Sequence, residues 1–338
     1  MGDLCRLGEV LEVLLATAAV SARLRLCDKR TVCTFIARPL RLPPEGSALT
    51  VAAVCHSSPP VCTMSNLLTL SDAIRTHLHQ GDCVALEGFT HLIPFAAGHE
   101  IIRQEKRDLT LVRMTPDVIF DQMIGMGCAK RLVFSWGGNP GVGSLHRLRD
   151  AVEKHFPHPI EIDERSHAAM TVSYTAAAAG LPFGVMRGFL GSDLAQYNPN
   201  IKFIDCPFTG ERLAAVPAIR PDVAIIHAQR ADRAGNVHLW GIVGVQKEIA
   251  LAARKVIVTV EEIVDDLDAP ANACVLPAWV VTAVCHVPGG AAPSYAHGYY
   301  DRDNSFYQAW DEVSRDRENF QRWMRENVMD TVPVKGGA

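Results

Sequence analysis

Four glycines fall within seven residues of the sequence, between an apolar run and a segment with helical spacing. The stretch runs from Gly137 to Gly143 and reads GGNPGVG. Such a turn lets backbone N–H groups approach a ligand closely, often a phosphate. The familiar nucleotide loops do not fit, because Ser144 replaces the P-loop lysine and the order G-x-G-x-x-G is absent. An anion-binding loop and a plain strand-to-helix turn, with Ser144 as N-cap, both remain open.

Three expected strand ends carry residues that could contact a ligand. In open parallel sheets, ligands collect at the carboxyl ends of the strands. Hydrogen-bond donors without bulky side chains at these strand ends would suit a carboxylate, a thioester oxygen or a pyrophosphate. The candidates are Glu87, Gly88, Phe89 and Thr90 in VALEGFTH, then Gly137, Gly138 and Asn139 in the glycine stretch, and then Gly191 and Ser192 in GFLGSDL.

Two carboxylates are possible acid/base groups. Glu87 stands directly on a turn after a strand and could act as a nucleophile or base, although a structural carboxylate is the interpretation that we favour. Glu164 precedes an Ala-rich helix, where the helix dipole alone favours an acid, and Ser166 beside it is a plausible N-cap. The chain therefore offers donors and a crevice but no convincing catalytic centre, which suggests that the missing group comes from another subunit.

Metal and hydrolase signatures are absent from the sequence. It contains no H-E-x-x-H spacing, no C-x-x-C pair and no G-x-S-x-G motif. His227, which follows the apolar run VAII, is expected to satisfy a core hydrogen bond rather than to bind a metal. We therefore expect no metal and no permanently bound cofactor.

Composition limits the class of protein. The 338 residues are 48% hydrophobic and 21% charged, with a net charge of −4, which is typical of a globular protein with a sizeable core. The absence of an extended Lys/Arg run argues against nucleic acid as the main partner. No apolar run reaches the roughly 18 residues that a spanning helix needs. Ten cysteines without paired spacing are expected to be reduced and buried, so we expect a cytoplasmic protein.

The chain is expected to have a boundary near Met64. Residues 1–63 show no sustained helical or strand period, and no basic segment precedes their apolar run as in a signal peptide. We expect residues 1–63 to be a non-native or disordered extension, residues 64–330 to form the domain and residues 331–338 to be a tail.

Helical and strand patterns alternate from Ser65 onward. Short apolar runs that alternate with helices of about 10–15 residues indicate βαβ units and a mostly parallel sheet in one α/β domain. The first helix is expected to have Ser71 as its N-cap. Strands are expected within 83–89, 108–114, 131–138, 223–229 and 255–264, and helices within 70–82, 95–106, 117–127, 166–180 and 245–255.

From Met64 to about Asp330 the chain resembles the alpha (A) subunits of family I coenzyme A transferases, of the glutaconate CoA-transferase type. The resemblance rests on several motifs in a fixed order, among them LTLSDAIRTHLHQGDCVALEGFTHLIP, SWGGNPGVGSL, CPFTGERLAAVPAIRPDVAIIHAQRAD and SYAHGYYDRDNSFY. It implies a Rossmann-like open sheet with helices on both faces. Within the family, ALEGFTHLIPFAAGHEIIRQ and HGYYDRDNSFYQAWD look closest to members that transfer CoA from succinyl-CoA to 3-oxoadipate in aromatic degradation.

The resemblance also implies a partner and a mechanism. A glutamate of the beta subunit makes a nucleophilic attack on the acyl-CoA and becomes a glutamyl-CoA thioester, which the acceptor acid then resolves, so the kinetics are ping-pong. The coenzyme A thioester is a substrate, and a dicarboxylic acid is the acceptor. The alpha subunit supplies the opposite wall, where Gly88–Thr90, Gly137–Asn139 and Ser192 would hold the acid or the developing oxyanion.

The chain departs from the family pattern at one position. The family pattern has two glycines before the phenylalanine, whereas Glu87 replaces the first one here. A carboxylate near an acid site repels its ligand unless it is turned away, protonated or paired.

Three alternative functions remain open. They are transfer of CoA to glutaconate or another dicarboxylate, hydrolysis of ring-derived CoA thioesters with Glu164 as the acting carboxylate, and a role as a non-catalytic binding partner.

Overall fold

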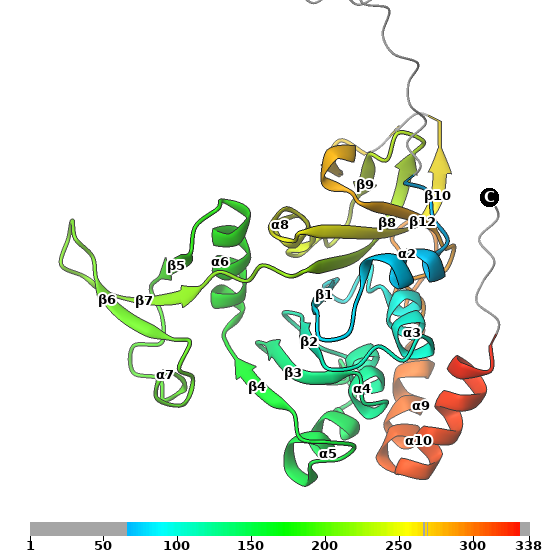
Figure 1. The fold of residues 1–338 in the computed structure, drawn as a ribbon, viewed down its shortest axis with the longest axis horizontal. Coiled ribbons are helices and arrows are strands. Elements are labelled where there is room, and N and C mark those ends of the chain that lie inside the picture. Colours follow the sequence, from blue (N-terminus) through cyan, green and yellow to red (C-terminus); the bar gives the residue numbers. More distant parts are fainter. Residues whose placement is uncertain (1–65, 266–267, 269, 332–338) are drawn as a thin grey trace, which may run out of the picture. The chain divides into compact units, whose positions relative to one another are not determined.

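The computed structural model describes residues 66–265, 268 and 270–331 (Figure 1). The chain divides into two units, residues 1–62 and 63–338, and every described residue belongs to the second. The expected extension, residues 1–63, lies outside the described residues, as does the expected tail apart from Thr331.

Seven parallel strands form the main part of the sheet, which the sequence predicted to be mostly parallel; five of the seven were predicted, and β4 and β12 were not. Two short strands, β9 (Val237–Leu239) and β11 (Cys274–Leu276), continue it in antiparallel orientation beside β8. In spatial order the parallel strands are β4 (Glu161–Glu164), β3 (Ala129–Phe134), β2 (Leu109–Val112), β1 (Cys83–Glu87), β8 (Val223–Asp232), β10 (Lys255–Val264) and β12 (Ala283–His286).

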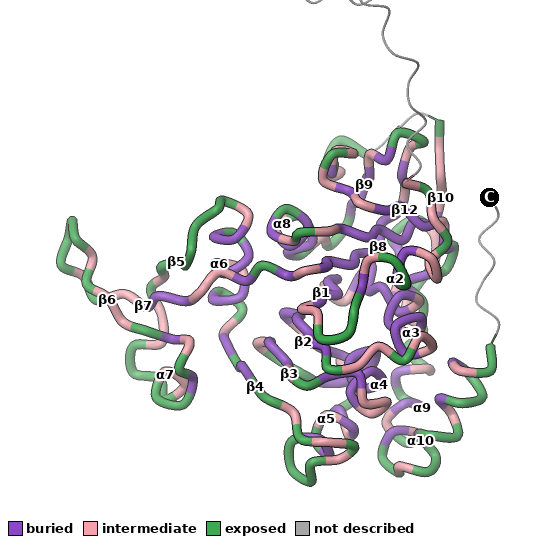
Figure 2. Tube along the Cα trace, viewed as in Figure 1, coloured by how far each residue is buried: buried purple, intermediate pink, exposed green. Residues whose placement is uncertain are grey.

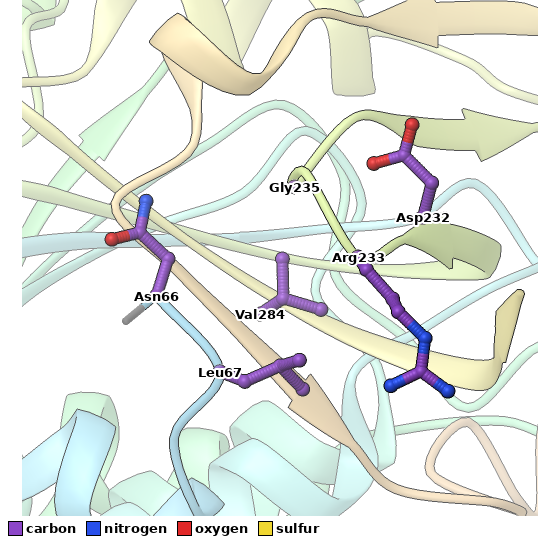
Figure 3. A pocket seen from close by; sticks show the side chains of 6 residues that line it. All are labelled: Asn66, Leu67, Asp232, Arg233, Gly235 and Val284. Atoms are coloured by element: carbon purple, nitrogen blue, oxygen red, sulfur yellow. The ribbon is translucent and has the colours of Figure 1, made fainter. Parts of the chain in front are cut away.

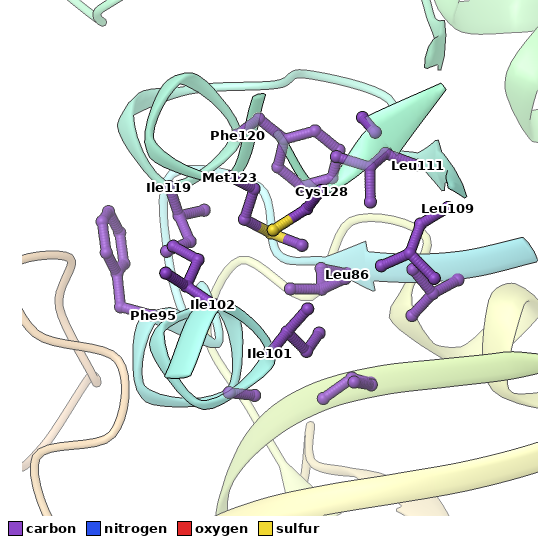
Figure 4. Packing of buried hydrophobic residues seen from close by; sticks show 14 of the residues in the cluster. Leu86, Phe95, Ile101, Ile102, Leu109, Leu111, Ile119, Phe120, Met123 and Cys128 are labelled. Carbon is purple, nitrogen blue, oxygen red and sulfur yellow. The ribbon is translucent and has the colours of Figure 1, made fainter. Parts of the chain in front are cut away.

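The side chains of the central strands alternate between two hydrophobic clusters, one on each face of the sheet. Val84 and Leu86 of β1 belong to one cluster, while Ala85 belongs to the other. Because helices cover both faces, the strands are nearly continuous apolar runs, and buried residues follow them in Figure 2. Figure 4 shows part of the first cluster, where residues of β1 and β2 pack against α3 and α4.

Helices on the two faces come from different parts of the chain. Those that contribute to the first cluster are α2 (Leu70–His77), α3 (Phe95–Arg103), α4 (Val118–Gly125), α5 (His146–Lys154), α9 (Asn304–Arg315) and α10 (Arg317–Met324). Those that contribute to the second are α6 (His167–Ala178) and α8 (Gln246–Ala252). The remaining helical elements among the described residues are short: the 3-10 turn η1 (Ala278–Val280), the π-helical turn η2 (Arg325–Met329) and the helix α7 (Leu194–Tyr197). None of the described helices combines the length and apolar composition that a bilayer span requires.

Of the three N-caps that the sequence analysis named, Ser71, Ser144 and Ser166, the structure has one. Ser166 Oγ accepts a hydrogen bond from Ala169 N at 3.1 Å and begins α6, as expected. The first described helix differs, because Thr69 Oγ1 accepts from Asp72 N at 3.1 Å. The prediction that Ser71 is the N-cap is therefore wrong, and α2 begins at Leu70.

A second, smaller sheet lies between α6 and β8 in the chain (Figure 1). It is antiparallel, with the order β5 (Phe183–Met186), β7 (Arg212–Pro217), β6 (Lys202–Asp205). Ala214 and Val216 of β7 are buried in a cluster with Ala169 of α6. Phe183 and Val185 of β5 alternate with that buried side and are 45% and 41% exposed. The sequence analysis predicted no sheet in this segment.

The order of the strands places a topological switch between β1 and β8. The chain leaves β1 to form β2, β3 and β4 on one side, and it returns on the other side with β8, β10 and β12. In open α/β sheets the ligand crevice lies outside the carboxyl ends of the strands at such a switch. The loop that follows β1, residues 88–92, lies at this point.

Candidate functional site

The loop Gly88–Leu92, here named the β1 loop, has a strained and tightly folded backbone. A Cβ atom on Gly88 would lie 2.6 Å from Leu92 O and 2.8 Å from His91 O, so this position excludes any side chain. Thr90 and Leu92 have φ angles of 60° and 52°, in the left-handed region that non-glycine residues rarely adopt. Such backbone persists where its surroundings fix it, and it clusters at ligand sites.

A buried ion pair holds the start of the β1 loop. Arg113, just after β2, donates from Nη2 to Gly88 O at 2.7 Å and from Nη1 to Asp117 Oδ1 at 2.9 Å. The two side chains are 1% and 2% exposed. Burial raises the pKa of the Asp117 carboxyl, while the neighbouring Arg113 opposes this shift. The sequence analysis missed this pair, although an arginine at the end of a buried strand was a usable signal.

Glu87 is enclosed within the chain. Its Oε1 accepts hydrogen bonds from Met114 N at 2.8 Å and from the Tyr174 hydroxyl at 2.7 Å, and the residue is 2% exposed. Burial raises the pKa of the Glu87 carboxyl, against the effects of Arg113 and the donors. The side chain thus links β1, the end of β2 and α6, in keeping with the structural interpretation of this carboxylate.

The loops after β1 and β3 meet at the start of α6. The Phe89 ring packs edge-on against the His167 ring, with centroids 6.2 Å apart. Ser135 Oγ donates to Met114 O at 2.6 Å and lies 3.1 Å from His167 Nδ1. Glu164 ends β4, pairs in register with Phe134 and is exposed. The carboxyl edge of the sheet therefore brings together Phe89, Ser135 and His167, with Glu164 on the outermost strand.

The glycine stretch satisfies most of its own hydrogen bonds. Gly138 N donates to Pro116 O at 3.2 Å, and Asn139 N donates to Gly143 O at 2.9 Å. The Asn139 side chain is buried and donates from Nδ2 to Tyr307 O at 2.7 Å. These donors therefore shape the turn, whereas no acceptor for Gly137 N occurs among the described residues.

A carboxylate of this chain occupies the N-terminus of the helix after the glycine stretch. Asp121 Oδ1, on α4, accepts from Arg147 N at 2.8 Å and from Leu148 N at 2.9 Å. Ser144 is not the N-cap as predicted, since α5 begins at His146 with Leu145 in the cap position. Burial raises the pKa of Asp121 to about 6, although its hydrogen-bond donors oppose the shift. Because a buried carboxylate already binds these N–H groups, they are not available to a phosphate.

Replacing Asp121 by alanine should lower the free energy of unfolding by about 2–4 kcal/mol, because it leaves a helix start and other buried donors without an acceptor. Urea unfolding followed by circular dichroism would measure this. Asp303→Ala is the matched control, since Asp303 caps α9 at an exposed position and should cost about 1 kcal/mol. Equal effects of the two substitutions would contradict the role of Asp121.

Gly191 and Ser192 do not lie at a parallel strand end as predicted. They occupy the turn between the antiparallel strand β5 and the short helix α7. Ser192 Oγ accepts from Leu194 N at 3.2 Å, and the side chain is exposed. Its hydroxyl proton remains able to donate to a ligand.

His227 satisfies core hydrogen bonds, as the sequence predicted. Its Nδ1 lies 2.8 Å from Thr259 Oγ1, and its Nε2 lies 2.6 Å from Glu261 Oε1. Glu261 also accepts from Gly289 N at 2.7 Å and from the Tyr300 hydroxyl at 2.6 Å. This buried cluster was missed by the sequence analysis, because its members are brought together only by the sheet. Within the described residues, no group of three or more His, Cys, Asp or Glu side chains is arranged to hold a metal ion.

A shallow depression in the surface lies elsewhere, beside the turn between β8 and β9 (Figure 3). It contains none of the predicted site residues. Its lining residues are Asn66, Leu67, Asp232, Arg233, Gly235 and Val284.

Comparison with known proteins identifies the family to which this chain belongs. The model of the coenzyme A transferase family matches residues 67–286, and the chain belongs to this family. Proteins of the family use CoA thioesters as substrates.

The most informative relatives point to one member of that class. The chain is 69% identical to the A subunit of the 3-oxoadipate CoA-transferase of Pseudomonas knackmussii, over 79% of this chain and 95% of the relative. The crystal structure of glutaconate coenzyme A-transferase from Acidaminococcus fermentans matches with a TM-score of 0.73 at 37% identity, covering 79% of this chain and 90% of that one. The cholesterol ring-cleaving hydrolase IpdA subunit of Rhodococcus jostii is 26% identical, over 76% of this chain and 90% of the relative.

Proposed function

We propose that this chain is the alpha subunit of an enzyme that transfers CoA from succinyl-CoA to 3-oxoadipate. The observation that carries the proposal is the 69% identity to a relative of that name over 95% of its length. The name of that relative designates it as one of the subunits of its enzyme, which implies a second one. Identity to the glutaconate enzyme and to the ring-cleaving hydrolase is much lower, at 37% and 26%, which disfavours both alternatives.

The proposed chemistry begins on a glutamate of the beta subunit. Its carboxylate attacks the thioester carbonyl of succinyl-CoA, expels CoA thiolate and leaves a mixed anhydride. The thiolate then attacks the glutamyl carbonyl, which releases succinate and leaves a glutamyl-CoA thioester. 3-Oxoadipate reverses the two steps and departs as its CoA thioester. No permanently bound cofactor takes part in this scheme.

The alpha subunit forms the opposite wall in this proposal. The backbone N–H groups of Phe89 and Thr90 have no acceptor among the described residues, and they lie in the β1 loop at the topological switch. With Gly137 N–H, they are the proposed donors to the acid or to the developing oxyanion, where each donor contributes about 3–4 kcal/mol in a water-poor cleft. The Ser192 hydroxyl is a further proposed donor, from the exposed turn after β5. Gly88, Gly138 and Asn139 shape the backbone around them.

Exposed apolar residues of the small sheet support the proposal that a second chain binds this part of the protein. Phe183 and Val185 are 45% and 41% exposed, and Phe208, after the neighbouring strand β6, is 93% exposed. An antiparallel sheet facing water normally carries polar residues on its open side, so Phe183 and Val185 on one strand mark a candidate interaction surface, whereas Phe208 lies in the turn between β6 and β7. We propose that the beta subunit contacts this side.

The unpaired state of the described cysteine thiols fits a reducing compartment. The five cysteines in the described part are all free, and burial raises the pKa of Cys128 and Cys285 to about 12. Such thiols are small buried hydrophobes with little reactivity. We therefore propose the cytoplasm as the location.

The test is an intact mass of each chain after the co-expressed pair is incubated with succinyl-CoA. We expect a CoA-sized covalent gain on the partner chain, removed by 3-oxoadipate. A gain on this chain instead would move the nucleophile to Glu87 or Glu164 and overturn the proposal. Cleavage of the thioester without a gain on either chain would favour the hydrolase.

Glu164 supplies a second test of the same proposal. Glu164→Gln should leave the turnover of a transferase within about threefold, because the reacting glutamate lies on the other chain, whereas it should abolish a hydrolase that uses this carboxylate. Glu161→Gln, at an exposed position on the same strand, is the matched control. Loss of activity in Glu164→Gln alone would contradict transfer through the partner's glutamate.

A further inference from the structure

The segment Gly289–Tyr300, here named the strap, runs beside the β1 loop and forms a parallel bridge with it at His91 and Tyr295. Two hydrogen bonds join the strap to the residues with positive φ. Ser294 Oγ donates to Thr90 O at 2.9 Å, and Leu92 N donates to Tyr295 O at 3.0 Å. The strap therefore contacts the β1 loop where its backbone is strained.

His91 adds a third connection whose direction is fixed. Its Nε2 accepts from His297 N at 2.9 Å, so the ring proton is on Nδ1, which donates to Ile242 O at 3.2 Å. Burial lowers the pKa of His91 to about 4, so the ring is neutral near pH 7. The neutral imidazole holds the loop between the strap and the segment before α8.

Both ends of the strap are attached to one carboxylate at the end of the main sheet. Glu261 Oε2 accepts from Gly289 N at the first end, and Oε1 accepts from the Tyr300 hydroxyl at the other. Glu261 is 5% exposed, and His227 Nε2 donates to the same Oε1 atom. Glu261 lies on β10 and His227 lies on β8. These hydrogen bonds therefore fix the position of the strap relative to the main sheet.

We propose that the strap sets the β1 loop in the conformation that binds the acid substrate, with Ser294 and Glu261 as its positioning residues. The inference rests on the proposed function and deepens it. Thr90 at φ 60° is costly for a non-glycine residue, and the hydrogen bond from Ser294 to its carbonyl offsets that cost. Without this bond the peptide that follows Thr90 is free to rotate, so the φ of Thr90 is no longer held near 60°. The preceding peptide, which carries the Thr90 N–H group, then loses the orientation proposed for binding the acid.

The experiment compares Ser294→Ala with Ser314→Ala in the co-expressed pair. Both serines are fully buried, but Ser314 Oγ has no hydrogen-bond partner in the described structure. Ser294→Ala should raise the KM for 3-oxoadipate about fivefold, equivalent to one ordinary hydrogen bond. The KM for succinyl-CoA should change less, because much of that substrate is the CoA portion. Ser314→Ala should change neither constant.

Glu261→Gln is the second variant, since it keeps an acceptor for one end of the strap and removes the charge. It should slow the release of CoA from the partner adduct by 3-oxoadipate, while the adduct still forms with succinyl-CoA. If Ser294→Ala and Glu261→Gln release CoA as fast as the unaltered enzyme, or if Ser294→Ala raises both KM values equally, the inference is wrong. If the unaltered pair forms no adduct at all, the proposed function fails instead.

Discussion

Asp117→Ala should lower the free energy of unfolding by about 3–5 kcal/mol, because removing one member of a buried ion pair leaves an uncompensated charge. Arg113 is fully buried, so its guanidinium group would lose its charged partner at a site that water does not reach. Asp117 Oδ1 also accepts from Ile119 N at the start of α4, so the substitution removes a helix cap as well. Chemical unfolding of the variant would measure the loss.

Two further variants separate the causes of this effect. Asp117→Asn retains an oxygen for the helix cap but removes the charge, so the difference between the variants isolates the cap. Glu153→Ala breaks the pair Arg149–Glu153, whose side chains are 58% and 51% exposed, and it should cost less than about 1 kcal/mol. If Asp117→Ala were as mild as Glu153→Ala, the buried pair would not be a main support of the β1 loop.

Gly88→Ala should reduce kcat/KM by about 100-fold or more, because the added methyl group displaces the β1 loop by a distance on the scale that matters for a bound substrate. The atoms nearest to the new Cβ would be Leu92 O, His91 O and Ile93 Cα, all at 2.9 Å or less. They are all backbone atoms, so no side-chain rotation can relieve the contact. Steady-state kinetics of the co-expressed pair would measure the loss.

Gly143→Ala is the control for this substitution. The nearest atom to a Cβ on Gly143 would be Asp311 Oδ1 at 3.8 Å, so the backbone there should remain in place and activity should stay within about threefold. Near-normal kcat/KM in Gly88→Ala would show that the shape of the β1 loop does not control the reaction.

The sheet was predictable because its pattern is local. Runs such as VAIIHAQ and KVIVTVEEIV are apolar at nearly every position, as strands buried on both faces must be, and they form β8 and β10. Asp117 and Ser166 also precede their helices directly. In contrast, β5 (FGVM) and β6 (KFID) are only partly buried and show no continuous apolar run, and the sequence analysis missed them.

The site was less predictable because its geometry depends on distant residues. Asp121 caps α5 from 26 positions away, which no local pattern reveals, and Ser144 was chosen instead. Thr90 and Leu92 have side chains that argue against positive φ, and their conformation depends on Ser294 and Tyr295. The sequence placed Gly88–Thr90 directly after a strand, and the structure places them after β1, but the sequence could not give the direction of the N–H groups.

The strap has a consequence for synthesis on the ribosome. Thr90 and the serine that holds its carbonyl are 204 positions apart in the chain. A nascent chain can form β1, β2 and β3 early, yet the loop at the end of β1 lacks its support until residue 300 has left the exit tunnel. A prematurely terminated product that ends after β12 would therefore contain every strand of the parallel sheet, but it would lack the strap and also α9 and α10, which cover part of one face of that sheet.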